Sequence, residues 1–305
     1  MTSSFDTILN ELRRNLPQNQ ERRDAGRLFH GRGNCFPGFE HLNIDFYPPV
    51  LVFQLFKEEP HLEDLIAQVA PEVPGQLCIL IQERYLPKCP WHLFSGQLPV
   101  HSLAWENGLA YQLQFMKNQN VGFFLDMRSG RELVGQLAEG KRVLNLFAYT
   151  CSLSVAAVAA KAKTVWNLDM SKSALRVGRE NHIRNGLDVR HVRFLPYDIL
   201  KSFGKIGKNG PYDLVIIDPP THQRGGFSAE KDYAKIVRRL PECLAPGALV
   251  LACLNAPKLS ATFLEDLFPQ DQFTLRQRLG RPLSFPERNG DESLKLLLYE
   301  FKGGP

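Results

Sequence analysis

Residues 142–169, RVLNLFAYTCSLSVAAVAAKAKTVWNLD, carry the pattern that decides the fold. An apolar run, RVLNLFA, is followed by a helical stretch, SLSVAAVAAKA, and then by a second apolar run, TVWNLD. Continuous apolar strands that alternate with helices are typical of a parallel sheet covered on both faces. This stretch therefore predicts a strand–helix–strand unit.

The same alternation continues toward the C-terminus. The segments SALRVGRENHIRNG, VRFLPYD, YDLVIIDPP, EKDYAKIVRRLPECL and ALVLACLN extend it, while FTLRQRLGR and SLKLLLYEF predict a closing antiparallel pair. Residues 118–305 are therefore expected to form a doubly wound, Rossmann-like α/β domain. In the first part of the chain, the β-rich segments LNIDFY, VLVFQLF and LCILIQERY surround one helical stretch, HLEDLIAQVA. We expect a smaller α+β domain over residues 1–117, a candidate for substrate recognition.

Composition and charge exclude several classes of protein. With 44% hydrophobic and 23% charged residues the chain is an ordinary globular sequence, and no apolar window is long enough for a transmembrane helix. The N-terminus has no secretory signal pattern, and the six cysteines contain no C-x-x-C spacing. We therefore expect a cytoplasmic protein with free thiols, no metal and no membrane partner.

Charge is divided unevenly between the two parts. Residues 1–117 hold 10 Lys and Arg against 13 Asp and Glu, whereas residues 118–305 hold 27 against 19. A basic second part favours an anionic partner, of which nucleic acid is the commonest. The densest basic run, from Lys172 to Arg193, is explained equally well as a solvated helix face.

Polar residues gather where the predicted strands end. In an open α/β sheet the ligand lies outside the carboxyl ends of the strands, and those ends carry Asn145–Thr150, Asp169, Asp198 and Asp218–Pro220. Asp169 follows Asn145 at about the spacing at which an acid meets the ribose hydroxyls of a nucleotide-type cofactor. The alternative for Asp169 is a turn residue or an N-cap before the helix expected to start near Ser171.

The loop LFAYTCSLS after the first of these strands contains no glycine. A dinucleotide needs a G-x-G-x-x-G turn, because the backbone must approach a pyrophosphate. An adenosine cofactor without phosphates avoids that requirement. S-adenosylmethionine is such a cofactor, and the helix start after Thr150 offers N–H groups to its carboxylate.

Seven blocks spread over most of the chain appear in a specific order. They are CFPGFEHLNIDFY (35–47), ENGLAYQLQ (106–114), VGFFLDMRSGR (121–131), RVLNLFAYTCSLSVAA (142–157), VWNLDMSKSALRVGRENHIRNG (165–186), YDLVIIDPPTHQ (212–223) and RPLSFPERNGDESLKLLLYEF (281–301). In this order they resemble the class I S-adenosylmethionine-dependent methyltransferases, specifically the bacterial 23S ribosomal RNA group that includes 5-methylcytosine and 7-methylguanine enzymes.

The resemblance implies a role for individual residues of these blocks. A catalytic loop, Asp218-Pro219-Pro220, would hold the acceptor base, with two prolines to stiffen it. In the family, Asp169 corresponds to the ribose acid and Asp198 to the acid near the adenine amine. The residues implied to bind the cofactor are Phe124, Asp126, Arg128, Asn145, Phe147, Tyr149, Thr150, Asp169, Met170, Ser171, Asp198 and Asp218.

The cysteines bear on which base is methylated. Forming 5-methylcytosine needs a cysteine nucleophile, which the family places one position later than Cys253. A one-residue slip in a strand turns the side chain to the other face, so we expect Cys253 to be a core thiol. Thr221 and Asn255 resemble the 7-methylguanine branch instead. Cys151 and Ser152 stand where the family usually has glycine, and a side chain there is expected to crowd the cofactor.

We predict a methyltransferase that acts on a base of RNA, with ribosomal RNA as the expected substrate. Arg224, in the expected loop THQRGGF, is a candidate clamp for the target nucleotide, and Phe227, Tyr233 and Phe285 are candidates to stack its base or else core residues. Two alternatives stay open: a methyltransferase of a small molecule or protein, and a noncatalytic RNA-binding protein. The sequence also leaves a homodimer open.

Overall fold

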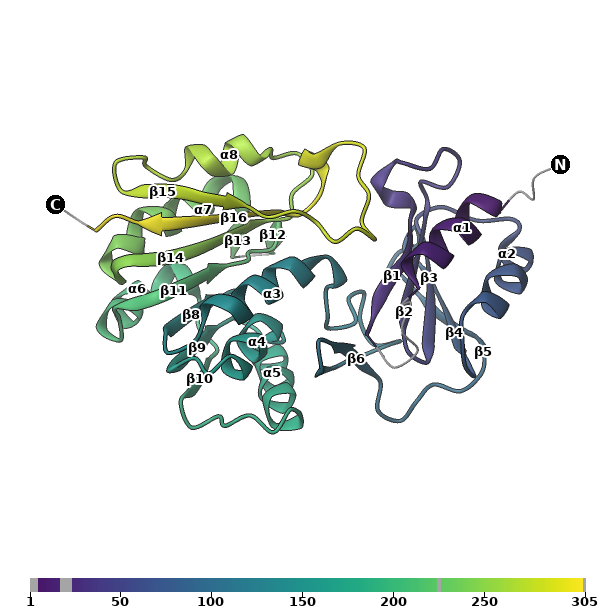
Figure 1. The fold of residues 1–305 in the computed structure, drawn as a ribbon, viewed down its shortest axis with the longest axis horizontal. Helices are drawn as coiled ribbons and strands as arrows, with labels where there is room; N and C mark the ends of the chain where they lie inside the picture. Colours follow the sequence, from purple (N-terminus) through teal and green to yellow (C-terminus); the bar gives the residue numbers. More distant parts are fainter. Residues whose placement is uncertain (1–4, 17–23, 224–225, 304–305) are drawn as a thin grey trace. The chain divides into compact units, whose positions relative to one another are not determined.

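The computed structural model describes residues 5–16, 24–223 and 226–303, which fold into two units (Figure 1). One unit runs to Leu125 and also takes in Pro282–Asn289. The other holds Asp126–Arg281 and the chain from Gly290 onward. The sequence suggests a boundary near residue 118, and the second unit begins at Asp126. Within the described part of the chain, no helix is long and apolar enough to cross a membrane.

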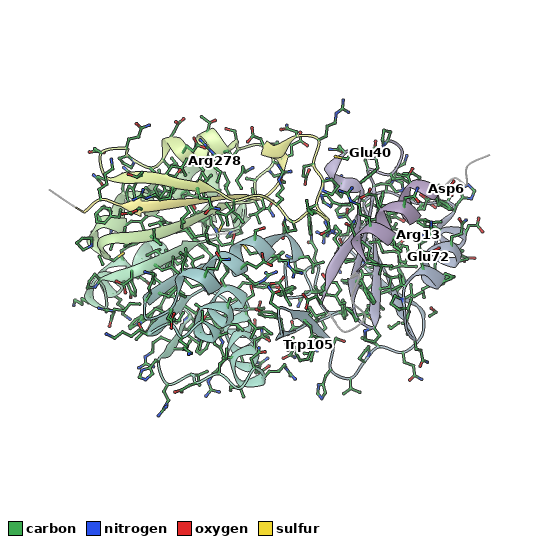
Figure 2. All side chains as sticks on the ribbon, in the orientation of Figure 1. Asp6, Arg13, Glu40, Glu72, Trp105 and Arg278 are labelled. Atoms are coloured by element: carbon green, nitrogen blue, oxygen red, sulfur yellow. The ribbon has the colours of Figure 1, made fainter. Side chains whose placement is uncertain are left out.

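The first unit is built on a five-stranded sheet with its strands in chain order. Only the β3–β4 pair is parallel, and the helix α2 makes that crossover. The helix α1 shares one core with α2 and the sheet, and its Arg13 pairs with Glu72 just after α2 (Figure 2). The elements are α1 (Asp6–Asn15), β1 (Gly26–His30), η1 (Gly31–Gly33), β2 (Leu42–Tyr47), β3 (Val50–Leu55), α2 (Leu62–Val69), η2 (Ala70–Glu72), β4 (Cys78–Glu83), β5 (Trp91–Ser95) and the hairpin β6 (Leu103–Glu106) and β7 (Leu109–Gln112).

The second unit has a seven-stranded sheet in the order β10-β9-β8-β11-β14-β16-β15. The first five strands of this order are parallel, and β16 is antiparallel to both of its neighbours. This confirms the doubly wound α/β sheet and its closing antiparallel pair. The strands are β8 (Arg142–Leu146), β9 (Thr164–Leu168), β10 (Val192–Leu195), β11 (Tyr212–Ile217), β14 (Leu244–Leu254), β15 (Phe273–Arg278) and β16 (Lys295–Phe301).

Helices cover both faces of this sheet, as the continuous apolar strands require (Figure 1). One face packs against α3 and α4, with α5 beside α4, and the other against α6, α7 and α8. The helical elements are η3 (Leu125–Met127), α3 (Arg128–Leu137), α4 (Ser152–Ala159), α5 (Lys172–Arg184), α6 (Ile199–Lys208), α7 (Ala229–Arg239), η4 (Leu240–Glu242), α8 (Ala261–Asp266) and η5 (Gly290–Glu292), and a short hairpin joins β12 (His222–Gln223) to β13 (Phe227–Ser228).

Candidate active site

The strand order of the second sheet changes direction between β8 and β11, which is where an open α/β sheet binds its ligand. The loops that follow these two strands begin side by side, because the amide of Asp218 donates to the carbonyl oxygen of Leu146 at 3.4 Å. Asp169 follows the neighbouring strand β9. The structure therefore brings the expected first loop, Asp169 and the Asp-Pro-Pro segment to one edge of one sheet.

The loop after β8 has an unusual backbone. Phe147, Tyr149 and Cys151 have positive φ angles of 59°, 46° and 61°. This left-handed conformation costs a residue with a side chain about 1–2 kcal/mol. Strain of this kind persists only where the surroundings fix it, and it is concentrated at functional sites.

Asp169 is one of the groups that fix this loop. Its Oδ2 accepts a hydrogen bond from the Tyr149 amide, and its Oδ1 accepts one from the Ser171 amide, each at 2.8 Å. The N-cap of α5 is Ser171, whose Oγ accepts from the amide of Ala174 at 3.2 Å. Asp169 is therefore not the N-cap of α5, although its bond to the Ser171 amide is the turn contact that the alternative also allowed. Its carboxylate is held rigidly and keeps lone pairs for further donors.

The helix α5 holds the same loop from inside the protein. The side-chain amide of Asn181, which is fully buried, donates to the carbonyl oxygen of Thr150 at 3.1 Å. Cys151 is also fully buried and packs against Gly178, where an added Cβ would lie 2.4 Å from the Cys151 Sγ. The Cys151 side chain thus points into the core beneath the loop. The Cys151 side chain is therefore directed away from the outer face of the loop, because Gly178 makes room for it, while the expectation for Ser152 stays a prediction.

Asn145 lies below the loop in a chain of buried hydrogen bonds. Its Nδ2 donates to Asn167 Oδ1 at 2.9 Å, and Asn167 Nδ2 donates to Ser154 Oγ at 3.0 Å. Ser154 in turn contacts His182 Nε2 at 2.9 Å, and His182 Nδ1 lies 2.7 Å from the carbonyl oxygen of Gly178. Because that carbonyl only accepts, the His182 proton sits on Nδ1 and Ser154 donates to Nε2. Burial lowers the pKa of His182, which agrees with a neutral ring.

Over the described part of the chain, the series of hydrogen bonds ends at Asn145, which keeps one unsatisfied acceptor atom. Asn145 is 1% exposed, and its Oδ1 has no hydrogen-bond partner among the described residues. A buried acceptor left in this state costs about 1–3 kcal/mol. An N–H donor supplied by a ligand would satisfy it, as the expected cofactor role of Asn145 requires.

The remaining cofactor candidates differ in their surroundings. Asp198 is the N-cap of α6, where its Oδ1 accepts from the amides of Leu200 and Lys201 at 3.0 and 3.4 Å. Met170 is 47% exposed beside Asp169, as an apolar wall for a ring would be. Arg128 donates to Glu132 at 3.0 Å, and Phe124 is 41% exposed at the end of the first unit. Their cofactor roles stay predictions.

Asp218 has the most perturbed charge at the site. Burial and, to a smaller extent, the negative charge of Asp126 raise its pKa to about 7, although the positive charge of Arg131 acts in the opposite direction. Asp126 and Arg131, from the second-unit part of the block 121–131, therefore act electrostatically on Asp218 of the expected catalytic loop. Arg131 is only 2% exposed and was missed by sequence reasoning. Arg131 is the last residue of that block, so the resemblance already pointed to this segment. The sequence alone, however, did not distinguish Arg131 from an arginine on an exposed helix face.

The catalytic loop is tied to the loop after β14. The Thr221 hydroxyl donates to the carbonyl oxygen of Asn255, so the two residues typical of the 7-methylguanine branch are in contact. Just inside this contact, the hydroxyl of the buried Tyr233 donates to the carbonyl oxygens of Ile217 and Cys253 at 3.4 and 3.2 Å. These bonds hold the ends of β11 and β14 together.

The residues proposed to stack a base do not have that role. Tyr233 is fully buried, and Phe227 is 4% exposed with its ring packed edge-on against Phe147 at 4.8 Å. Phe285 is 7% exposed and belongs to the first unit, under the guanidinium of Arg27. All three are core residues. The candidate clamp Arg224 lies outside the described residues.

The thiols of the second unit are all enclosed. Cys151, Cys243 and Cys253 are buried, and burial raises the pKa of each. Cys253 is therefore a protonated core thiol, as the register of the strand predicts. Over the described ranges, no group of three or more His, Cys, Asp or Glu side chains could hold a metal ion.

The residues at these strand ends fit S-adenosylmethionine. The first loop lacks a glycine cradle for a pyrophosphate, and Asp169 presents a fixed carboxylate to hydroxyl groups. The helix α4 begins right after this loop, and Cys151 makes no side-chain cap to its first turn. The amides there suit a carboxylate.

The fold and this site define a methyltransferase of the Rossmann-like class. Residues 26–300 match the family described as S-adenosylmethionine-dependent methyltransferase, and the chain belongs to that family. Its cofactor is S-adenosylmethionine.

Relatives and a solved structure support this assignment. Ribosomal RNA large subunit methyltransferase I of Shewanella denitrificans is 31% identical over 279 residues, which cover 86% of this chain and 67% of that protein. A ribosomal RNA large subunit methyltransferase of Deinococcus radiodurans is 32% identical over 259 residues, 80% of this chain and 62% of that protein. The chain thus spans about two thirds of these relatives' length. The crystal structure of SMU.776, a methyltransferase complexed with SAH, aligns with a TM-score of 0.81 and 27% identity, covering 91% of this chain and 75% of that one.

Proposed function

We propose that this chain methylates a base of large-subunit ribosomal RNA in the cytoplasm. The observation that carries the proposal is the catalytic loop at the switch point, where Asp218 lies beside Asp126 and Arg131. The names of the relatives point to the same substrate, and the matches to these relatives cover 86% and 80% of this chain. The surplus of basic residues after residue 117 favours an anionic partner.

One group of residues at the strand ends binds the cofactor, and another positions the base. S-adenosylmethionine supplies a methyl group on a positively charged sulfur. Asp169 binds the ribose and holds Tyr149, so the strained first loop keeps one geometry toward the cofactor. The loop Asp218–Pro220, tied down through Thr221 and Asn255, positions the base in line with the methyl.

The acceptor atom follows from the state of the thiols. A cysteine nucleophile must be a thiolate within reach of the base, whereas Cys151, Cys243 and Cys253 are buried with raised pKa values. We therefore favour a ring nitrogen that is nucleophilic by itself, such as N7 of guanine. Methylation at N7 develops positive charge on the ring. The carboxylates of Asp126 and Asp218 stabilise that charge, while Arg131 keeps Asp218 partly ionised near neutral pH.

Mass spectrometry of ribosomal RNA nucleosides from cells with and without the gene tests this proposal. The expected result is the loss of one methylated base, restored by the wild-type gene but not by Asp218→Asn. Asp188→Asn, an exposed acid paired with Arg190, is the matched control and restores the base. An unchanged set of methylated nucleosides would contradict the proposal.

Methyl transfer only to small molecules or proteins would favour the first alternative, and no cofactor binding at all would favour a noncatalytic RNA-binding protein. Sedimentation of the purified wild-type protein decides between a monomer and a homodimer.

A further inference from the structure

The first unit contains a cluster of cationic side chains around one aromatic ring. The guanidinium carbon of Arg32 lies 4.6 Å from the centre of the Phe56 ring, and that of Arg84 lies 5.4 Å from the same point. The two guanidinium carbons are therefore no more than about 10 Å apart. Each residue comes from a different element, since Arg32 is in η1, Phe56 follows β3 and Arg84 follows β4.

These two arginines differ from a third one nearby. Arg27 forms a two-pronged ion pair with the buried Asp45, with distances of 2.6 and 3.0 Å. In contrast, neither Arg32 nor Arg84 forms an ion pair with any carboxylate in the described parts of the chain. Burial lowers the pKa of Arg84, as do the positive charges of Arg27 and Arg32, while Cys89 and the carboxylate of Asp45 raise it. Arginines that form no ion pair favour an anionic ligand.

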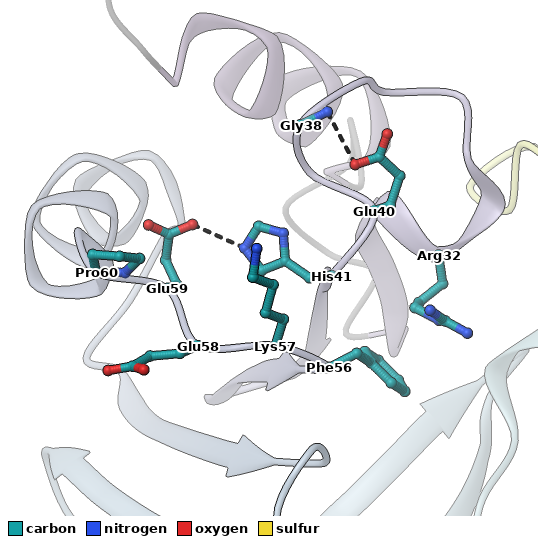
Figure 3. A pocket seen from close by; sticks show the side chains of 9 residues that line it. All are labelled: Arg32, Gly38, Glu40, His41, Phe56, Lys57, Glu58, Glu59 and Pro60. Carbon is teal, nitrogen blue, oxygen red and sulfur yellow. Dashed lines mark hydrogen bonds and ion pairs between the residues drawn. The ribbon is translucent and has the colours of Figure 1, made fainter.

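A cavity of about 480 Å³ opens against this cluster (Figure 3). Figure 3 shows Arg32 and Phe56 at one end of the cavity, Glu58 and Glu59 at the other, and Lys57 between them. The volume lies within the range of small-molecule sites, roughly 300–1,000 Å³. Part of the lining, namely Gly38, Glu40 and His41, belongs to the sequence block 35–47, to which the resemblance gave no role.

The acids of this cavity limit what can bind. Glu59 accepts hydrogen bonds from His41 at 2.9 Å and from the His61 amide at 3.0 Å, and Glu40 accepts from the Gly38 amide at 3.0 Å. Glu58 is exposed. A simple anion filling the cavity would meet these carboxylates. A ligand with a phosphate at one end and hydroxyl or amino donors at the other complements both ends.

We propose that this cavity binds one nucleotide of the RNA substrate, with its phosphate at Arg32 and its base against Phe56, both of which line the cavity, whereas Arg84 lies outside the lining. Phosphate contacts by arginine and stacking of unpaired bases on aromatic rings are the usual elements of RNA recognition. The ribose 2′-hydroxyl and the base amines are donors for the carboxylates at the far end, which distinguishes RNA from DNA. This inference rests on the proposed function, and it gives the otherwise acidic first part of the chain a role in binding the substrate.

The test measures binding of a fluorescein-labelled single-stranded RNA over a series of salt concentrations. Arg32 is exposed, so Arg32→Ala is expected to fold, and it should reduce the slope of log affinity against log salt by about 0.7, the loss of one phosphate contact. Arg32→Lys keeps the charge and should keep most of the slope. Arg14→Ala removes an exposed arginine of the same unit, paired with Glu11, and should leave the slope unchanged.

The outcomes separate this inference from the proposed function. Wild-type protein that neither binds nor methylates ribosomal RNA would overturn the proposed function. Wild-type protein that does both, combined with equal slopes for Arg32→Ala and Arg14→Ala, would overturn the nucleotide site alone. The nucleotide site would also be overturned if uridine monophosphate bound as tightly as the RNA and Arg32→Ala weakened both equally. The cavity would then bind a free nucleotide and not a nucleotide of the RNA substrate. A smaller slope in Arg32→Ala alone, with weaker binding of the matching DNA to wild type, supports it.

Discussion

Gly178→Ala should destabilise the protein because of one neighbour, the side chain of Cys151. A Cβ at position 178 would lie 2.4 Å from the Cys151 Sγ, 2.8 Å from its Cβ and 3.3 Å from the carbonyl carbon of Thr150. Overpacking of this kind costs about 1–3 kcal/mol. Alanine recovers about 1 kcal/mol through its higher helix propensity. We expect a net loss of up to about 2 kcal/mol, with a fall in Tm of roughly 2–4 °C for each kcal/mol.

The same substitution should behave differently when Cys151 is changed to glycine. Cys151→Gly removes the two closest contacts, leaving the 3.3 Å contact with Thr150, and it suits the φ of 61° at that position. In this background Gly178→Ala keeps the helix-propensity gain of about 1 kcal/mol, reduced by the remaining Thr150 contact, so the double-mutant cycle should give a coupling near the overpacking cost of about 1–3 kcal/mol. Calorimetric unfolding of the four proteins measures the coupling. Equal losses in both backgrounds would refute the argument that Cys151 occupies the space left by Gly178.

Three further predictions concern the acids and the thiol of the site. Asp169→Asn loses one acceptor for the backbone amides of the first loop, so S-adenosylmethionine binding by calorimetry should weaken at least about tenfold, while Asp188→Asn binds as wild type. Asp218 has a folded-state pKa near 7, above its unfolded value, so the folded state holds the extra proton and stability falls as pH rises from about 4 to 7, by roughly 4 kcal/mol at most. Melting curves of the cofactor-free protein should show this loss, Asp218→Asn should not, and parallel pH profiles would speak against the raised pKa. Cys253→Ala should keep methyl transfer to RNA within about twofold, since a buried protonated thiol is no nucleophile; complete loss of transfer in a folded variant would point to a cysteine mechanism instead.

The sheet of the second unit was predictable because its strands are buried on both faces. Val143–Leu146 and Leu214–Ile217 are at most 1% exposed, and such continuous apolar runs allow only a covered parallel sheet. The position of the site followed from the same reasoning. Once the strands are parallel, Asp169 and Asp218 must lie at the same edge, and no contact between distant residues has to be known in advance.

Contacts between distant residues were out of reach of the sequence. The packing of Cys151 against Gly178 and the burial of Phe227 against Phe147 both depend on how helices and loops meet. Periodicity says which face of an element is apolar, but not which partner that face meets. The return of Pro282–Asn289 to the first unit is of the same kind, because the segment has no periodic pattern and is held there by His30 and Glu287 at 3.0 Å.

The loop after β14 shows how such contacts bear on the chemistry. Lys295, only 6% exposed, donates to the carbonyl oxygens of Ala256 and Asp291 at 3.0 and 2.6 Å, and a carboxylate oxygen of Asp291 accepts from the Ala261 amide at 2.8 Å. Asn255 is the residue before this anchored position, and it binds Thr221 of the catalytic loop. Burying an ammonium group in a core costs free energy, because the charge loses its contact with water. The hydrogen bonds to the two backbone carbonyl oxygens offset part of that cost. Lys295 thus fixes the backbone at Ala256, directly after the residue that binds Thr221 next to the expected catalytic loop.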